Sequence, residues 1–284
     1  MSTVNAIAEF LEELGKVCQG EVRSDAFSRT LYSTDASIYQ VMPHGVLIPK
    51  GLEDLQAAVE LAHKWGVALV ARGGGSSMTG QSINEALIID MSRHLNQILE
   101  INVEERWVRA QPGLVIDHLN RQLKSHGLQL GPDPASSNRG TVGGLVANNS
   151  TGKHSLIYGM TADHVLETTV LLSDGSRVMF GPVQEIPAYR SGLEGQIYRG
   201  VSRLVTDSNN RKMIREGTVK HWRRCGGYNL DRMVDEPIPF HHARDKRFNL
   251  SNLICGSEGT LAVMEEVKLR LVPLPKMTAL AIVE

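Results

Sequence analysis

A strand, an amphipathic helix and a second strand lead directly into a glycine-rich loop between residues 44 and 81, and this order limits the fold more than any other feature. The apolar run 44–49 ends in proline. Leu52–Trp65 then gathers apolar residues on one helix face, with acids in its first turn. Gly66 ends this helix before the apolar run 67–71. Two strands joined by a helix predict a βαβ unit and therefore the beginning of a parallel sheet.

The loop that follows, Arg72–Gln81 (RGGGSSMTGQ), holds four glycines and three hydroxyl residues in ten positions. Glycine permits positive φ and close backbone approach, so the N–H groups of such a loop can turn toward an anion. The pyrophosphate of a nucleotide cofactor is the ligand that this favours. The dinucleotide fingerprint fails because Met78 replaces its third glycine, and the Walker pattern fails because Gln81 replaces its lysine. A flexible surface connector is the alternative that composition leaves open.

Two further clusters contain many small residues. Residues 131–152 (GPDPASSNRGTVGGLVANNSTG) combine an entry turn stiffened by prolines with a small-residue stretch and neutral hydrogen-bonding side chains. This composition suits a flat heterocycle lying against backbone, and an irregular loop is the equally open alternative. Residues 255–260 (CGSEGT) place a glutamate between glycines, where a simple turn would also explain it.

The remaining segments predict a mixture of helices and strands around these clusters. Helices are expected at 3–18 and 114–127, strands at 86–92, 97–103 and 106–111, and a hairpin at 164–180 with Asp174–Gly175 at its turn. Residues 182–250 are more polar and resemble an insertion, and 252–275 return to strand character. The apolar run 277–284 predicts the first strand of a further domain.

The composition of the 284 residues excludes several classes of protein. Hydrophobic content of 42% with 21% charged residues is typical of a globular chain, and the net charge of −1 gives no electrostatic motive for binding nucleic acid. Three cysteines without CxxC spacing argue against a disulfide framework or a structural zinc site. Neither a signal peptide nor a run of 18 apolar residues is present, so no transmembrane segment and a cytoplasmic location are predicted.

The histidines do not form a recognisable reactive pattern. His241 and His242 are adjacent, so their side chains diverge on any regular element, and no third ligand has suitable spacing; we expect no metal site. His221 and Cys225 lie four residues apart but lack an orienting third group.

Taken together and in order, the clusters resemble the FAD-binding domain of the vanillyl-alcohol oxidase/p-cresol methylhydroxylase (PCMH-type) superfamily. The resemblance is strongest to FAD-linked D-2-hydroxyacid dehydrogenases (D-lactate, D-2-hydroxyglutarate or glycolate) of the large FAD plus iron–sulfur type. It extends from about Asp35 to Pro275. It rests on RGGGSSMTGQ, SSNRGTVGGLVANNSTG, YGMTADHVLETTVLLSDG, GGYNL (226–230) and GSEGTLAVMEEVKL.

The resemblance implies an α+β fold, a PCMH-type FAD-binding domain with two α/β subdomains. Residues 1–40 would form a helical lead-in and 41–275 the FAD-binding domain, with the insertion at about 182–250 and a truncated substrate-cap domain beginning at 276–284. One lobe would occupy about 40–105 and the other the residues beyond, with FAD extended between them. An iron–sulfur cluster would belong only to the full-length protein.

The resemblance also implies cofactor-binding residues. Those on the pyrophosphate side are Arg72, Gly73, Gly74, Gly75, Ser76, Ser77, Met78, Thr79, Gly80 and Gln81. Those on the riboflavin side are Pro132, Asp133, Ser137, Thr141, Gly143, Gly144, Asn148, Ser150 and Gly152, with Val165, Glu258 and Gly259 as weaker candidates near the adenine or the sheet edge. Some members attach FAD through a histidine in the first loop; here the loop has no His or Cys, so FAD is expected to bind non-covalently. Arg139 is the nearest candidate cation for reduced flavin, and a surface arginine is the alternative.

The implied activity is oxidation of a D-2-hydroxy acid, D-2-hydroxyglutarate or D-lactate, to the 2-oxo acid by hydride transfer to flavin N5, with an electron acceptor completing the cycle. The family places the catalytic base and the carboxylate-binding cation mainly in the cap, so this chain is expected to bind FAD with little or no turnover. A non-catalytic flavin-binding module of a complex and an oxidase of another alcohol, such as an alditol or a phenol, stay open as alternatives. Peripheral association of the full-length protein with the inner membrane also stays open.

Overall fold

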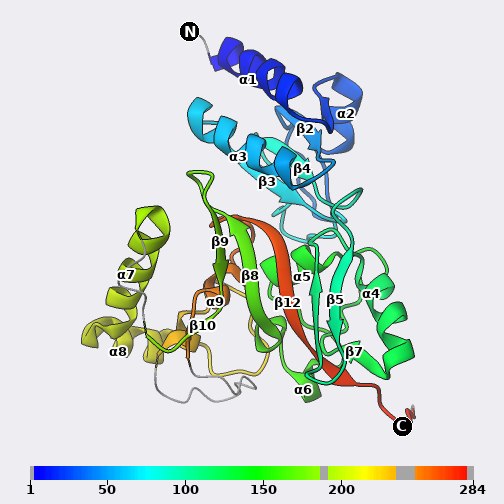
Figure 1. Ribbon diagram of the computed structural model, residues 1–284, viewed down its shortest axis with the longest axis vertical. Helices are drawn as coiled ribbons and strands as arrows, with labels where there is room; N and C mark the ends of the chain where they lie inside the picture. The colour runs from blue at the N-terminus through cyan, green and yellow to red at the C-terminus, as the bar shows by residue number, and fades with distance from the viewer. Residues whose placement is uncertain (1–2, 186–190, 235–246, 280–284) are drawn as a thin grey trace.

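Two separate β-sheets divide the protein into an N-terminal lobe and a larger lobe, seen at the top and the bottom of Figure 1. This computed structural model describes residues 3–185, 191–234 and 247–279. The α+β fold predicted from the sequence, with two subdomains, is confirmed by this architecture.

The N-terminal lobe is built on a four-stranded sheet with the strand order β1–β2–β4–β3. In that order the strands are Glu21–Arg23, Gly45–Ile48, Leu87–Asp90 and Leu69–Arg72. β2 and β3 both run parallel to β4, and β1 pairs antiparallel with β2. The predicted βαβ unit is therefore confirmed, with β4 lying between its two strands.

Helices cover this sheet and complete its core. α3 (Leu52–Trp65) ends at Gly66, whose φ of 65° is the left-handed conformation that glycine adopts most easily. α1 (Thr3–Val17) packs against α3 and buries Phe10 and Leu14 in the core of this lobe. The short helix α2 (Ala26–Leu31), which the sequence did not predict, lies beside β2.

The larger lobe contains an antiparallel sheet with the order β5–β6–β12–β8–β9, and β7 pairs with the far end of β12. Its strands in chain order are Ile98–Asn102, Trp107–Ala110, Leu128–Leu130, Val165–Leu171, Arg177–Phe180 and, for β12, Val263–Pro273. The predicted β8–β9 hairpin is confirmed, with Gly175 at a φ of 82° in its turn.

The boundary between the lobes differs from the sequence expectation. Residues up to about 105 were expected in the first lobe, but β5 pairs with β6 in the larger sheet. A short turn that includes Arg106 at a φ of 58° joins these two strands, so they form a hairpin and cannot belong to different sheets. Leu171 and Val263 of the larger sheet pack into the core of the N-terminal lobe, so the two lobes are in direct contact.

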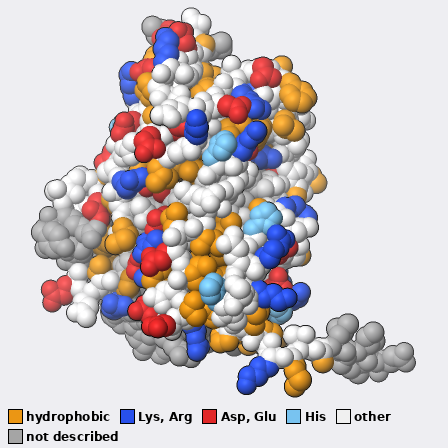
Figure 2. Space-filling view, turned by 45° about the vertical axis from the view of Figure 1, so that its right-hand side comes forward, with side chains coloured by type: hydrophobic (Ala, Val, Ile, Leu, Met, Phe, Trp, Pro, Cys, Tyr) orange, Lys and Arg blue, Asp and Glu red, His pale blue; other side chains and the backbone are white. Residues whose placement is uncertain are grey.

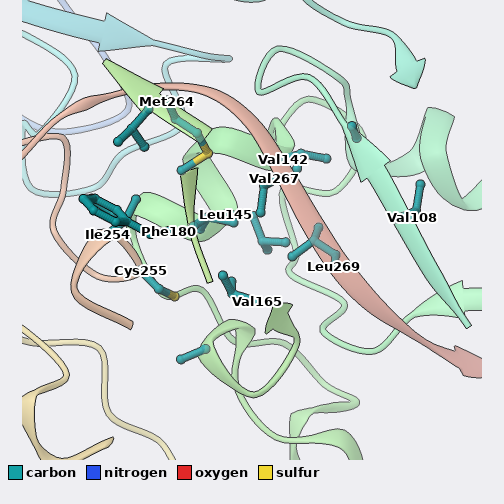
Figure 3. Packing of buried hydrophobic residues seen from close by; sticks show 14 of the residues in the cluster. Val108, Val142, Leu145, Val165, Phe180, Ile254, Cys255, Met264, Val267 and Leu269 are labelled. Atoms are coloured by element: carbon teal, nitrogen blue, oxygen red, sulfur yellow. The ribbon is translucent and has the colours of Figure 1, made fainter. Parts of the chain in front are cut away.

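Short helices pack on the larger sheet and close its core. Their bounds are α4 Ile116–Leu123, η1 Lys124–His126, α5 Val142–Ala147, α6 Ser155–Tyr158, η2 Thr161–Asp163 and α9 Ser251–Ile254. Figure 3 shows Val142 and Leu145 of α5 among Val267 and Leu269 of β12. Strand character was expected from residue 252, but residues 252–254 are helical and the strand begins only at Val263.

The polar segment that follows the β8–β9 hairpin begins and ends in two short strands that pair with each other. β10 (Pro182–Val183) pairs antiparallel with β11 (Phe248–Asn249). Between them lie α7 (Gly192–Thr206), α8 (Ser208–Gly217) and η3 (Leu230–Met233). His241, His242 and residues 280–284 of the expected final strand lie outside the described residues, and residues 277–279 form no strand.

Candidate functional site

The first glycine loop begins at the end of β3, where Arg72 fixes it to the preceding chain. The Arg72 guanidinium donates to the carbonyls of Tyr32 (3.2 Å), Thr34 (2.8 Å) and Ser82 (3.2 Å). It also lies over the Tyr32 ring, 5.3 Å from its centre. Burial lowers the pKa of Arg72. Its charge is thus used to hold the two ends of the loop together.

Most backbone N–H groups of this loop form no hydrogen bond to the described protein. From Gly73 to Met78, none of them donates to an acceptor among the described residues. Gly75 and Gly80 have φ values of 61° and 85°, which turn the chain within this stretch and again just beyond it. A row of N–H groups without protein acceptors can bind the oxygens of a pyrophosphate.

The first loop packs directly on the second glycine segment, residues 131–152. A Cβ on Gly73 would lie 2.1 Å from Thr141 Oγ1, and one on Gly74 would lie 2.2 Å from the carbonyl oxygen of Arg139. Only glycine allows this approach, so these two glycines bring the loop onto the segment. The Arg139 side chain is exposed and donates to Asn138 Oδ1 (3.0 Å).

The second segment is internally packed. Thr141 caps α5 through its Oγ1, which accepts from the N–H of Gly144 at 3.3 Å. A Cβ on Gly143 would lie 2.6 Å from Pro112 Cβ, and one on Gly152 would lie 1.8 Å from the carbonyl oxygen of Asp133. The beginning and the end of the segment therefore cross in direct backbone contact.

Charged groups stand where the segment crosses itself. Asp133 Oδ2 lies 3.0 Å from Lys153 Nζ and 3.5 Å from His154 Nδ1. The sequence analysis did not single out Lys153 or His154, although they directly follow Gly152. Pro132 is buried, and the carbonyl of Ser137 accepts from the N–H of Asp117 at 3.0 Å.

The third cluster joins the first two through Gln81. Gln81 Nε2 donates to Asn148 Oδ1 at 3.2 Å and lies 3.5 Å from Glu258 Oε1. The N–H groups of Gly256 and Glu258 donate to the last carbonyls of α5, at 3.0 and 2.8 Å. All three glycine clusters therefore meet at one place, although Gln81 and Glu258 are 177 residues apart in sequence.

Two non-glycine residues here have left-handed backbone, Asn149 at a φ of 44° and Glu258 at 52°. Such conformations cost about 1–2 kcal/mol and persist where the surroundings impose them. Asn149 is 1% exposed. Its Oδ1 accepts from the N–H of Ala162 (3.0 Å) and its Nδ2 donates to the carbonyl of Arg224 (3.3 Å). Asparagine tolerates this backbone better than most residues, which is the sequence signal that could have identified it.

A buried ion pair between Arg232 and Asp163 lies next to the backbone that binds Asn149. Arg232 Nη2 donates to Asp163 Oδ1 at 2.8 Å, and both side chains are 2% exposed. Burial is the largest single influence and opposes ionisation of Asp163, but the charge and hydrogen bond of Arg232, together with the N–H of Met160, outweigh it and lower the pKa of the carboxyl group. Burial also raises the pKa of the nearby Cys255 thiol to about 12, so this cysteine is a packing residue.

Val165 stands apart from the other predicted site residues. It begins β8, pairs with Leu269 and lies in the core, as Figure 3 shows. Within the described part of the chain, no three His, Cys, Asp or Glu side chains are grouped as a metal site requires. No described helix is both long enough and apolar enough to cross a membrane. Acidic and basic side chains are intermixed on the face seen in Figure 2.

Comparison with known proteins now connects this geometry to a cofactor. Residues 43–181 match the family model for an FAD binding domain. The chain contains an FAD-binding domain of the PCMH type. FAD is therefore its cofactor. The residues present fit a dinucleotide that carries a pyrophosphate: the first loop offers backbone N–H groups without described acceptors, its glycines allow close approach, and the second segment supplies neutral hydrogen-bonding groups.

Relatives of this FAD-binding domain are similar over nearly all of it. D-2-hydroxyglutarate dehydrogenase of Pseudomonas putida is 38% identical over 281 residues, which is 96% of this chain and 27% of the relative. The enzyme of that name from Escherichia coli is 34% identical over 98% of this chain and 27% of its own length. Glycolate oxidase subunit GlcD of Bacillus subtilis is 29% identical over 90% of the chain and 43% of the subunit.

The solved structures support the fold. An alkyldihydroxyacetonephosphate synthase superposes with a TM-score of 0.64 and 22% identity, covering 95% of this chain and 44% of the synthase. The chain spans 27% of the length of the two dehydrogenases, so their similarity to it covers only part of each enzyme.

Proposed function

We propose that this chain is the FAD-binding part of a flavin-dependent oxidoreductase that oxidises a D-2-hydroxy acid, D-2-hydroxyglutarate or D-lactate, to the 2-oxo acid. The observation that carries the proposal is 34–38% identity to D-2-hydroxyglutarate dehydrogenases across 96–98% of the chain, including all three glycine clusters. The convergence of those clusters on Gln81 supports a shared role in holding one ligand.

In this proposal the N–H groups and hydroxyls of residues 73–81 hold the pyrophosphate of FAD. The riboflavin side lies along the second segment, with the hydroxyl and amide groups of Ser150 and Asn148 available to it. Glu258 and Gly259 close the site beside Gln81. No His or Cys lies in the first loop, which supports non-covalent binding.

The reaction removes a hydride from C2 of the hydroxy acid and a proton from its hydroxyl group. Bound FAD supplies the two-electron acceptor for the hydride. The residues of this chain bind and orient that acceptor and keep its phosphates in place. The proton needs a base and the substrate carboxylate needs a cation, and we assign both to the part of the longer relatives that this chain does not cover.

An electron acceptor is required to reoxidise FAD after each turnover, and the proposal leaves its identity to experiment. We also propose a cytoplasmic location. Its support is the scarcity of cysteine and the presence of Cys18, Cys225 and Cys255 as free thiols.

The first test is the visible absorption of the purified chain, before and after acid precipitation. A flavin spectrum that moves into the supernatant is expected for non-covalent FAD. The second test mixes the FAD-loaded product of the complete reading frame anaerobically with D- and L-2-hydroxyglutarate and D-lactate. Bleaching near 450 nm by a D-acid alone is expected, and bleaching by an alditol or a phenol would overturn the substrate class.

A further inference from the structure

The motif Gly226–Leu230 (GGYNL) lies outside the residues that match the family model, yet the structure places it against the third glycine cluster. The phenol oxygen of Tyr228 lies 2.9 Å from Thr260 Oγ1. Thr260 Oγ1 itself donates to the carbonyl of Ser257 at 2.6 Å. Because the threonine hydrogen is used there, the phenol donates its own hydrogen to Thr260. The outer end of the tyrosine ring is therefore fixed.

The backbone that carries Tyr228 is fixed on both sides. Asn229, 5% exposed, donates to the carbonyl of Cys255 at 2.7 Å. Upstream, the carbonyl of Arg224 accepts from Asn149 at 3.3 Å, and downstream Arg232 pairs with Asp163. The loop is thus attached to the second segment and to the third cluster, and Tyr228 has little freedom left to lose when it binds a ligand.

Glycines on both sides of this contact, next to Tyr228 and next to Thr260, face open space. A Cβ on Gly226, Gly227 or Gly259 would meet nothing within 4 Å. Gly227 and Gly259 have φ values of 78° and 79°, so glycine is favoured at both positions. Tyr228 itself is 48% exposed, although its hydroxyl group is satisfied. A rigid aromatic ring beside open glycine backbone suits a flat heteroaromatic ligand that stacks on it or meets its edge.

We propose that Tyr228 contacts a ring system of FAD, and this inference rests on the proposed binding of FAD at the three glycine clusters. Thr260, the partner of Tyr228, lies two residues from Glu258, and Glu258 reaches Gln81 at the end of the pyrophosphate loop, so Tyr228 is linked to that site. FAD carries two flat heterocycles, adenine and isoalloxazine, and both offer the face that tyrosine recognises. The experiment separates them.

The test compares FAD affinity in the wild-type chain, Tyr228→Leu and Tyr228→Phe by fluorescence titration. Loss of an aromatic–base contact is expected to weaken binding roughly 5- to 150-fold in Tyr228→Leu. Tyr228→Phe keeps the ring and is expected to stay within about 3-fold of wild type, since only a single neutral hydrogen bond is lost. Phe27→Leu removes an aromatic ring that is 79% exposed in α2 and serves as the matched control without effect.

Two further measurements identify the ring. If Tyr228 contacts adenine, Tyr228→Leu also weakens ADP as a competitor of FAD and leaves the flavin fluorescence lifetime unchanged. If it contacts isoalloxazine, ADP competes as before and the lifetime lengthens, because a nearby tyrosine quenches flavin emission by electron transfer.

Wild-type affinity in Tyr228→Leu would overturn the inference while leaving FAD binding intact. A wild-type chain that takes up no FAD would instead defeat the proposed function. Should Tyr228→Leu fail to fold by circular dichroism, Tyr228→Gln provides the same decision. It also removes the ring but keeps a hydrogen-bonding group, and unchanged FAD affinity in that variant would again overturn the inference.

Discussion

The first loop and the second segment are both rich in glycine, but they use it in opposite ways. In the first loop, Arg72–Gln81, the glycines turn the chain and leave a row of N–H groups without described acceptors. In the second segment, Gly143 and Gly152 allow backbone to press against backbone. One region stays open toward a ligand, and the other is closed upon itself and supports it.

This difference separates stability from affinity. Changes that disrupt the packing within the second segment, or the ion pair behind it, should reduce the free energy of unfolding, because those contacts exist without any ligand. Changes of the exposed side chains in the first loop should reduce FAD affinity alone. The lesson is that glycine content by itself does not identify a binding loop; the state of the N–H groups does.

The largest effect is expected from Asp163→Asn, which removes one partner of the buried ion pair behind the second segment. The uncompensated Arg232 charge should lower the free energy of unfolding by about 3–5 kcal/mol. Urea unfolding measures it. Glu12→Gln, in an exposed pair with Lys16, is the matched control and should leave stability close to that of wild type, because solvent screens an exposed ion pair. Equal effects of the two substitutions would contradict the assigned burial.

Gly152→Ala should come next. Its Cβ would lie 1.8 Å from the carbonyl oxygen of Asp133, so two backbone stretches must separate. Overpacking of this kind costs about 1–3 kcal/mol, measured by the same unfolding experiment. Gly144→Ala is the control, because its Cβ would have only an ordinary contact at 3.4 Å with Thr141 Oγ1 inside a helix. That variant should be as stable as wild type or more stable, and a loss like that of Gly152→Ala would refute the packing argument.

In the first loop, the double variant Ser76→Ala/Ser77→Ala should change FAD affinity and leave stability nearly unchanged. Neither hydroxyl group bonds to a described residue, so stability should stay within about 0.5 kcal/mol of wild type. FAD affinity should fall roughly 10-fold, as expected when hydrogen bonds to a phosphate are lost. Calorimetric titration with FAD and unfolding of the FAD-free protein measure the two quantities. Reduced stability with unchanged affinity would reverse the comparison.

The mildest change is expected with pH. His164 packs against Gly131 at the start of the second segment, with Nδ1 facing the carbonyl of Arg270 (3.1 Å) and Nε2 that of Tyr158 (2.9 Å). Burial lowers the pKa of His164 below its usual 6.5. The unfolded chain therefore takes up a proton first, so stability should be constant above about pH 6.5 and fall as the pH decreases below it.

Unfolding at intervals between pH 7.5 and pH 5 tests this dependence. His164→Gln should show a shallower slope in that window, whatever its absolute stability. A slope unchanged by the substitution would assign the dependence to other groups.

The sequence predicts those elements whose signals are local. α3 was found at its observed bounds because an apolar face, acids in the first turn and a terminal glycine all agree. The β8–β9 hairpin was found because an Asp-Gly turn joins two apolar runs. Both signals arise within a few residues and depend little on the rest of the chain.

Elements that depend on distant contacts were not predicted. α5 lies in a stretch whose glycines and asparagines disfavour a helix, and it forms because Thr141 caps it and the core covers Val142 and Leu145. The meeting of Gln81 with Glu258 is equally invisible, because the two belong to different lobes. The composition of the glycine clusters indicated a site, but only the assembled sheets determine which residues meet there.

The pairing of β12 has a consequence for how the protein is made. This strand lies between β6 and β8 and also pairs with β7, so the larger sheet is held together by residues 263–273. On the ribosome, β5–β6 and β8–β9 emerge as separate hairpins long before the strand that unites them. Throughout that interval the edges of β6 and β8 are free to pair elsewhere. Shortening the wait before residue 263 is synthesised should therefore raise the yield of folded protein more than any gain in synthesis speed after it.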